Sequence, residues 1–367
     1  MATLCRRYGI SRKTGYKWLG RYGEGGVAGL EDRNRAPRGT PHGLAPEVTE
    51  KILTLRRRYP TWGPRKLLAR LFVEFPSATW PAASTVGDLL KRHGLVRRRE
   101  KGRRSPDSSG PIVEATGANE SWSADFKGWF RTGDGVRCEP LTISDNFSRY
   151  LITCQAVPKV TLGEVQPLFE RAFRDHGLPR AIRTDNGTPF AHRPGLGGLT
   201  RLSVWFLKLD IWPDRIAVGR PDQNGRHERM HRTLAEDTAS PPAADLALQQ
   251  ARFDDWRETY NTIRPHEALG QQCPMQFQQP SARPFPAVLH PWEYPADHHV
   301  RRVDAKGYIK WRDGRVYLTE ALRKETVALF CDDNGNWAIR YRKFDLAVLD
   351  HHSGEIFCSG VARSGHP

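Results

Sequence analysis

From Glu120 to Ile263 the chain alternates strand-like and helix-like segments, and their order restricts the folds that it can adopt. Three apolar runs separated by turn residues predict three successive strands, and an amphipathic stretch closed by Gly177 predicts a helix. Two further strands then alternate with helices. The predicted strands are residues 122–130, 137–145, 149–157, 180–184 and 211–218, and the predicted helices are residues 162–176, 200–207, 222–238 and 243–263. We therefore predict an α/β domain over residues 118–275, built on one mixed sheet.

This order of strands and helices is that of a ribonuclease-H-like sheet. Three acidic residues lie at positions in it from which their side chains could meet at one edge of the sheet. Asp125 lies inside the first predicted strand, Asp185 follows the fourth at an Asn-Gly turn, and Glu228 lies in the first turns of a helix. Hard divalent cations prefer oxygen ligands, and two of them can activate an attacking oxygen and neutralise a leaving oxygen at a phosphodiester. We predict that these three carboxylates converge, hold Mg²⁺ (or Mn²⁺) and are catalytic.

Four residues next to the carboxylates are predicted to support the site. Asn186 and Gly187 form the turn after Asp185, and Asn224 can cap the helix of Glu228. Gly187 and Gly225 leave room for a nucleic-acid backbone to approach.

Nearly all of the excess positive charge lies in the first third of the chain. Residues 1–110 contain 24 Lys and Arg against 9 Asp and Glu, a net of +15, whereas the whole chain of 367 residues has a net of +16. Segregation of this size is typical of a module that binds nucleic acid. We predict a helix-turn-helix with a short or missing first helix at residues 1–22, a linker at 23–43, a second helix-turn-helix or winged module at 44–96, and a basic linker at 97–117.

Cations in these modules and near the carboxylates are candidate DNA contacts. Ser11 is placed to cap a helix on which Tyr16 and Leu19 pack inward and the polar residues face DNA, although an ordinary capped surface helix is the alternative. The candidate contacts are Arg12, Lys13, Thr14 and Lys17 in the first module, Arg65 and Lys66 in the second, and Lys127, Arg229 and Arg232 near the carboxylates.

The last part of the chain loses helical periodicity. Residues 276–297 form a Pro- and Gln-rich linker, and short β-like runs recur over residues 298–352, separated by Asp313-Gly314 and Asn334-Gly335 turns. We predict a small β-barrel of five or six strands there.

Composition excludes several other classes of protein. The six cysteines are scattered and give neither a disulfide framework nor zinc-binding spacing, which favours a reducing cytoplasm. No run approaches the roughly 20 apolar residues of a membrane span, and the amino terminus has no apolar signal core. We expect neither membrane insertion nor secretion.

Five motifs resemble those of the integrase-core transposases of bacterial insertion sequences, which are relatives of retroviral integrases. In family order they are Trp122-x-x-Asp125-Phe126-Lys127, Ser144-Asp145-x-x-Ser148-Arg149, Thr184-Asp185-Asn186-Gly187, Pro221-x-x-Asn224-Gly225-x-x-Glu228-Arg229-x-His231-Arg232-Thr233-Leu234 and Tyr260-Asn261-x-x-Arg264-Pro265-His266-x-Ala268-Leu269-Gly270. The resemblance implies that Asp125, Asp185 and Glu228 are the DDE metal ligands of a transposase that cuts and joins double-stranded DNA as a homo-oligomer. The 42 residues between Asp185 and Glu228 exceed the family's roughly 35, and a longer loop near residues 191–199 would absorb the difference.

Two other functions remain open at this point. His227-Glu228-Arg229-Met230-His231 matches H-E-x-x-H, the zinc-binding motif of metalloproteases, but polar residues precede it and no third ligand follows at helical spacing. We therefore prefer histidines that face solvent or DNA beside a metal-binding carboxylate, and we interpret Asp145 as a turn cap. The second alternative is a DNA-binding repressor that keeps the fold without catalysis, against which the intact acidic residues argue.

Overall fold

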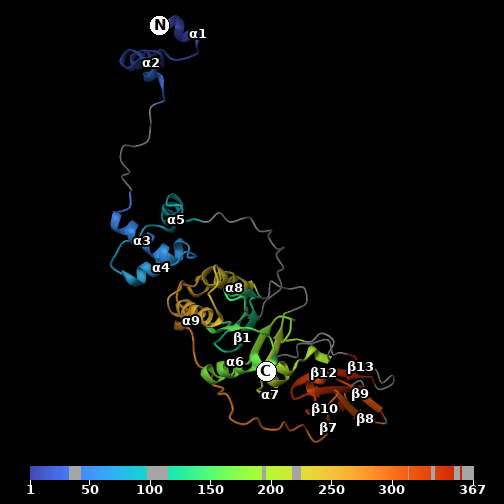
Figure 1. Cartoon of the computed structure of the whole chain (residues 1–367). Helices are drawn as coiled ribbons and strands as arrows, with labels where there is room; N and C mark the ends of the chain where they lie inside the picture. The colour runs from blue at the N-terminus through green and yellow to red at the C-terminus, as the bar shows by residue number, and fades with distance from the viewer. Residues whose placement is uncertain are drawn as a thin grey trace. The chain divides into compact units, whose positions relative to one another are not determined.

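The protein was analysed as a computed structural model, which describes residues 1–32, 43–96, 115–191, 196–216, 225–312, 314–331, 335–350 and 356–357 (Figure 1). The chain forms two compact units, Met1–Thr49 and Glu50–Pro367. Within the described ranges, no helix is both long and apolar enough to cross a membrane.

The first unit contains helices α1 (Ala2–Arg7) and α2 (Arg12–Gly25), followed by the 3₁₀ helix η1 (Gly26–Leu30). The predicted cap is confirmed, because the Ser11 side chain accepts a hydrogen bond of 3.1 Å from the backbone N–H of Thr14. This bond satisfies one of the free N–H groups at the start of α2.

The prediction that Tyr16 and Leu19 of α2 pack inward is wrong. Tyr16 and Leu19 are 55% and 54% exposed, whereas Gly15 is buried. A side chain at Gly15 would meet α1, because a Cβ there would lie 2.5 Å from Cys5 Sγ. Because the two helices approach closely, α2 packs on α1 through the face that carries Gly15. The spacing of apolar residues alone does not reveal this.

Three helices follow, α3 (Pro46–Arg58), α4 (Pro64–Glu74) and α5 (Ala83–Arg92), and the second unit begins inside α3. The Arg56 guanidinium links their connections by donating to the carbonyls of Trp62 (2.5 Å) and Leu95 (2.6 Å). Their shared interior is apolar. Its buried residues include Ile52, Leu55, Leu67, Leu71, Val86 and Leu90.

A mixed sheet forms the centre of the second unit and has the predicted order. Its strands are β1 (Ser121–Phe126), β3 (Arg137–Asp145), β4 (Leu151–Val157), β5 (Ala181–Thr184) and β6 (Trp212–Arg215), arranged as β4-β3-β1-β5-β6. Strands β1, β3 and β4 are antiparallel to one another, whereas β5 and β6 run parallel to β1.

The first predicted strand, 122–130, is interrupted. After β1 the backbone takes a positive φ of 86° at Gly128, and pairing with β3 resumes only at the two-residue strand β2 (Phe130–Arg131). Glycine adopts this conformation readily, so the chain leaves the ladder immediately after Asp125 and Lys127.

Helices cover both faces of the sheet and enclose two separate apolar interiors (Figure 1). On one face lie α6 (Leu162–His176), which has the predicted bounds, and α7 (Arg201–Lys208). On the other lie α8 (Gly225–Thr238) and α9 (Leu246–Thr262). Buried aromatic residues dominate the α6 side, which contains Trp122, Phe169, Phe173, Phe190 and Phe206. The α8 side contains Cys138, Leu151, Cys154, Met230, Leu234, Phe253 and Trp256.

The carboxyl-terminal strands form an open antiparallel sheet in the order β13-β12-β11-β10-β7, with a separate hairpin β8-β9. The strands are β7 (His299–Arg302), β8 (Tyr308–Trp311), β9 (Gly314–Tyr317), β10 (Thr326–Cys331), β11 (Trp337–Tyr341), β12 (Phe344–Leu349) and β13 (Ile356–Phe357). The predicted barrel is not confirmed, because over the described residues the pairing does not close. The sheet instead buries its apolar residues with those of the β8-β9 hairpin and of α7.

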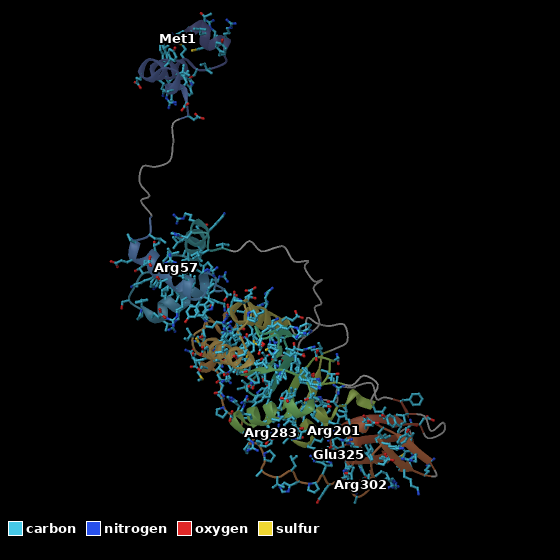
Figure 2. All side chains as sticks on the ribbon, viewed as in Figure 1. Met1, Arg57, Arg201, Arg283, Arg302 and Glu325 are labelled. Carbon is cyan, nitrogen blue, oxygen red and sulfur yellow. The ribbon has the colours of Figure 1, made fainter. Side chains whose placement is uncertain are left out.

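Contacts with the turn after α7 fix this sheet on the α/β domain. Phe344 packs on Trp212 with ring centroids 5.1 Å apart, and Glu325 (labelled in Figure 2) pairs with Lys208 at 2.5 Å. Lys343 donates to the Asp210 carboxylate at 3.0 Å. An aromatic contact and two charged contacts therefore join the sheet to the domain.

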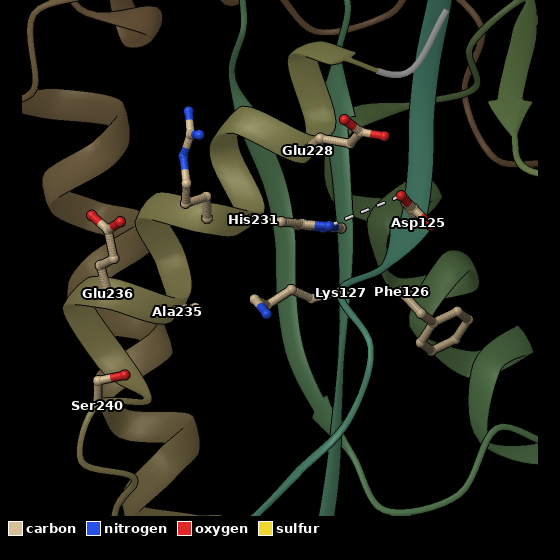
Figure 3. A pocket seen from close by; sticks show the side chains of 9 residues that line it. Asp125, Phe126, Lys127, Glu228, His231, Ala235, Glu236 and Ser240 are labelled. Atoms are coloured by element: carbon tan, nitrogen blue, oxygen red, sulfur yellow. Dashed lines mark ion pairs between the residues drawn. The ribbon is translucent and has the colours of Figure 1, made fainter. Parts of the chain in front are cut away.

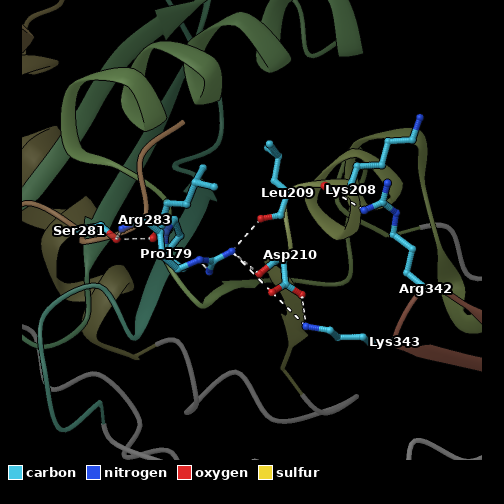
Figure 4. Close-up of polar contacts among 9 residues, drawn as sticks. Pro179, Lys208, Leu209, Asp210, Ser281, Arg283, Arg342 and Lys343 are labelled. Atoms are coloured by element: carbon cyan, nitrogen blue, oxygen red, sulfur yellow. Dashed lines mark hydrogen bonds and ion pairs between the residues drawn. The ribbon is translucent and has the colours of Figure 1, made fainter. Parts of the chain in front are cut away.

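The predicted linker 276–297 contacts the same turn. Arg283 donates to the carbonyls of Pro179, Leu209 and Asp210, each at 2.8 Å (Figure 4). Ser281 donates to the carbonyl of Leu178 at 2.6 Å. One arginine therefore fixes the connection to the ends of α6 and α7 before the chain enters the carboxyl-terminal sheet.

Candidate active site

Asp125 and Asp185 lie at the carboxyl ends of the neighbouring strands β1 and β5. Strands β1 and β5 pair in parallel, with Ser121 opposite Ala181 and Ser123 opposite Arg183, a constant offset of 60 residues. Asp125 lies two residues beyond the last position of β1 that pairs with β5, and Asp185 is the first residue after β5. The carboxyl ends of parallel strands are the usual place for sites in α/β sheets.

Glu228 joins Asp125 at a pocket of about 530 Å³ between β1 and α8. In Figure 3, Glu228 and His231 both extend from α8 toward Asp125, and Lys127 lies below them. Lys127 and Arg232 also line the pocket and give it cationic groups beside the two carboxylates. The pocket thus combines acidic groups that suit a cation with basic groups that suit a phosphate.

Asp185 does not line this pocket. Its Oδ1 accepts a hydrogen bond of 3.0 Å from the backbone N–H of Gly187, and Asn186 donates to the carbonyl of Ile216 at 2.8 Å, which ties the end of β5 to the end of β6. Among the described residues, no three His, Cys, Asp or Glu side chains approach closely enough to hold a metal ion. The structure therefore brings Asp125 and Glu228 to one pocket and places Asp185 at the end of the neighbouring strand.

The donor atoms nevertheless fit the predicted cation. All three predicted ligands offer carboxylate oxygens, which hard cations such as Mg²⁺ and Mn²⁺ prefer. Asp125 has 16% of its side chain exposed and Glu228 is exposed, so both can accept an ion from solvent.

His227 and His231 are buried, and the prediction that they face solvent or DNA is wrong. They are 4% and 7% exposed, and the Nε2 atoms of both lie 2.7 Å from the Thr142 hydroxyl. Burial lowers the pKa of His227 to about 4 and that of His231 to about 2, so both rings are neutral at physiological pH. At positions i and i+4 of α8 they share the face that packs on the sheet.

This arrangement also removes the support for a zinc protease. The Nε2 atoms that would bind zinc instead share a hydroxyl, and within the described ranges no third ligand lies near them. Glu228, between the two histidines in sequence, points into the pocket with Asp125.

The candidate DNA contacts divide into two groups. Those at α2 and the pocket are accessible, since Arg12, Lys13, Lys17, Arg229 and Arg232 are exposed and Thr14 and Lys127 are half-buried. The two in α4 have other partners. Lys66 donates to the carbonyl of Pro265, and Arg65 pairs with Glu267 at 2.9 Å.

Lys66 in particular does not match the role predicted for it. Burial, together with the neighbouring Arg264 guanidinium, lowers the pKa of Lys66 to about 8. A basic helix in a sequence does not reveal which of its cations turns inward. Of the supporting residues, Asn224 lies outside the described residues, and a Cβ at Gly225 would meet no atom within 4 Å.

Thr142 is the functional residue that sequence reasoning missed. It lies in β3 directly opposite Asp125, is fully buried, and contacts both histidines. A threonine in an apolar strand gives no signal of its own, because its importance depends on the register between β1 and β3 and on how α8 packs.

Gly187 leaves the space that the Asp185 carboxylate occupies. A Cβ at Gly187 would lie 2.9 Å from Asp185 Oδ2. We expect Gly187→Ala to displace this carboxylate and lower metal-dependent DNA cleavage by about 10–100-fold, since a 1 Å misplacement can cost that much. Cleavage of a labelled end duplex measures the effect. Gly163→Ala in α6, where a Cβ meets nothing within 4 Å, is the matched control, and equal activity in the two variants would contradict this role.

Comparison with known proteins agrees with the predicted family. Two models described as integrase core domain match residues 115–221 and 209–274, and a homeodomain-like domain matches residues 14–90. The insertion element IS476 uncharacterized 39.2 kDa protein of Xanthomonas euvesicatoria is 29% identical over 66% of this chain and 67% of its own length. The insertion element IS136 uncharacterized protein Atu4601 of Agrobacterium fabrum is 32% identical over 52% of this chain and 94% of its own length.

Among solved structures, a chain of the simian T-cell lymphotropic virus intasome, solved in complex with a PP2A regulatory subunit, aligns with 80% of this chain and 94% of its own. Its identity is 15% and its TM-score 0.39.

The sheet order and the matched domains define an integrase-core protein with a homeodomain-like region near its amino terminus. Within that class, the chain belongs to the integrase-core family of bacterial insertion-element proteins.

Proposed function

We propose that this protein is a DNA transposase that binds the ends of its insertion element and catalyses metal-dependent strand cleavage and strand transfer. One observation carries the proposal. Asp125 and Asp185 lie at the carboxyl ends of the neighbouring parallel strands β1 and β5, and Glu228 on α8 lines the same pocket as Asp125. Membership of the integrase-core family supports it.

The three carboxylates would hold Mg²⁺ or Mn²⁺, which when bound polarises the phosphate and lowers the pKa of an attacking water. The protein's own cations contribute separately. Lys127 and Arg232 line the pocket and can contact the phosphates on either side of the bond that breaks. Acidic and basic groups therefore have different targets in the same pocket.

Cleavage and joining need the same geometry twice. First, a water oxygen attacks the phosphorus at the element end, the bond to the 3′ oxygen breaks, and that oxygen leaves as a 3′-hydroxyl. Second, this hydroxyl attacks a phosphorus in the target, loses its proton, and displaces the target's own 3′ oxygen. Each step makes one phosphorus–oxygen bond and breaks one, so a single pocket serves both.

DNA binding is assigned to residues 1–96 in this proposal, with exposed Arg12, Lys13 and Lys17 on α2 as contacts. The partner is double-stranded DNA, both element end and target, in the bacterial cytoplasm. Two ends must be held together during transfer, which requires a homo-oligomer on DNA. The division into domains at residues 22, 43, 96, 117, 275 and 297 belongs to the same proposal.

The proposal is tested with labelled duplexes that carry the inverted repeats flanking the gene. The expected result is nicking at the repeat and joining to a second duplex, both requiring Mg²⁺ or Mn²⁺ and both abolished by EDTA. A duplex with a scrambled repeat serves as the control. Repeat-specific binding without nicking in either metal would overturn the proposal in favour of a repressor that has kept the fold.

A further inference from the structure

The two buried histidines of α8 form a connected group with Thr142 that ends at Asp125. Thr142 Oγ1 lies 2.7 Å from Nε2 of both His227 and His231, and His231 Nδ1 lies 3.9 Å from Asp125 Oδ2. All three members are less than 10% exposed. We call this group the Thr142 relay.

The hydroxyl of Thr142 has one proton, and this limits how the relay can be protonated. It lies close to three possible acceptors, the two imidazoles at 2.7 Å and the Asp125 carbonyl at 3.2 Å. If the proton goes to the carbonyl, both imidazoles donate their Nε2–H groups to the hydroxyl; if it goes to one imidazole, only the other imidazole donates.

The charge of Asp125 decides among these arrangements. If Thr142 donates to His231 Nε2, the His231 proton is on Nδ1 and points at the carboxylate. Either other arrangement would aim the Nδ1 lone pair at a negative oxygen 3.9 Å away. The favoured chain therefore runs from His227 Nε2–H to Thr142, and from Thr142 to His231 Nε2.

From this arrangement we propose that His231 is a positioning residue of the active site, held by His227 and Thr142 with its proton on Nδ1 so that its N–H orients the Asp125 carboxylate. At 3.9 Å the contact is longer than a hydrogen bond, so it acts through the attraction between the N–H dipole and the carboxylate charge. Carboxylates that bind metals are commonly oriented by such neighbours.

The relay has a second effect, because its members come from both walls of the pocket. Thr142 is opposite Asp125 on β3, whereas His227 and His231 are on the helix that carries Glu228. One hydroxyl thus fixes the distance between the element bearing Glu228 and the strands bearing Asp125. The inference rests on the proposed function only in taking Asp125 and Glu228 as metal ligands.

The tautomers can be observed directly, without metal or DNA. In protein labelled with ¹⁵N-histidine, long-range ¹H–¹⁵N spectra at neutral pH distinguish a protonated Nδ1 from a protonated Nε2. Signals are assigned with His227→Gln and His231→Gln. We expect His231 protonated at Nδ1 and His227 at Nε2. A His231 ring protonated at Nε2 would overturn the inference whatever the protein's activity.

The consequence for metal binding is measured with Mn²⁺ by electron paramagnetic resonance. We expect Thr142→Val and His231→Leu to weaken Mn²⁺ binding by about 10–100-fold, the usual cost of losing a residue that orients a metal ligand. Thr153→Val removes a buried hydroxyl on β4 outside the relay and should leave the affinity unchanged. Unchanged affinity in His231→Leu would refute the positioning role of His231, and unchanged affinity in Thr142→Val would refute the part given to Thr142. A wild-type protein that binds no Mn²⁺ would instead count against the proposed function, and the tautomers would decide the relay alone.

Discussion

Replacing Asp185 with Asn is expected to reduce both DNA cleavage and strand transfer by about 1,000-fold or more, which corresponds to about 4 kcal/mol of transition-state stabilisation. The amide keeps the size of the side chain and can still accept from Gly187 N–H through its oxygen, so the turn after β5 remains intact. What it loses is the negative charge that a divalent cation needs.

The measurement compares cleavage, transfer and end binding in the same preparation. End binding should be retained, because residues 1–96 carry it in the proposed function. Asp214→Asn is the control, since Asp214 lies on the neighbouring strand β6 and pairs with Arg183 at 2.7 Å, outside the pocket. Asp185→Asn protein that still cleaves would show that the assigned carboxylates are not the active site.

Local patterns in the sequence were sufficient to predict the helices and strands that position the site. The apolar spacing of residues 162–176 and the glycine that follows predict α6 with its observed bounds, and the predicted order of strands and helices is the observed one. These elements follow from short-range periodicity, which depends only on which side of a helix or strand is buried. The position of Asp185 directly after its strand comes from the same patterns.

Features that depend on contacts across the fold could not be predicted in this way. Whether α8 turns its histidines toward solvent or toward β3 depends on the packing of Met230 and Leu234, and the sequence offers polar residues on every side of that helix. Lys66 is similar, since its partner is a carbonyl about 200 residues away. The open carboxyl-terminal sheet is a third case, because α7 supplies apolar surface that an isolated barrel would have had to provide for itself.

Removing the carboxylate of Asp145 is expected to lower stability and leave DNA cleavage intact, whereas Asp185→Asn is expected to reduce cleavage strongly and leave the fold intact. Asp145 is buried, and its oxygens accept from the backbone N–H groups of Asn119 (3.0 Å) and Ser148 (2.7 Å) and from the Ser148 hydroxyl (2.6 Å). These bonds hold the turn between β3 and β4, in which Arg149 has a positive φ of 63°.

Asp145→Ala leaves three donors without this partner, two of them buried on Ser148, and each unsatisfied buried donor costs about 1–3 kcal/mol. We expect a loss of about 3 kcal/mol or more, a large share of the roughly 5–15 kcal/mol that stabilises a domain. Hydrogen–deuterium exchange of β1, β3 and β4 should accelerate by about two orders of magnitude, because each 1.4 kcal/mol is tenfold. Asp255→Ala on the exposed side of α9 should change stability by less than about 0.5 kcal/mol.

Asp185 and Asp145 lie in similar sequence motifs, but we expect the first to act in the reaction and the second to stabilise the fold. At a temperature where Asp145→Ala protein remains folded, it should still cleave the element end, because both Asp145 oxygens already accept hydrogen bonds from Asn119 and Ser148. An Asp145→Ala protein of normal stability that does not cleave would show that this carboxylate acts in the reaction, and the assignment of the ligands would have to include it. Stability lost and cleavage kept would assign Asp145 to the turn, and leave the reaction to the acids at the ends of β1 and β5 and on α8.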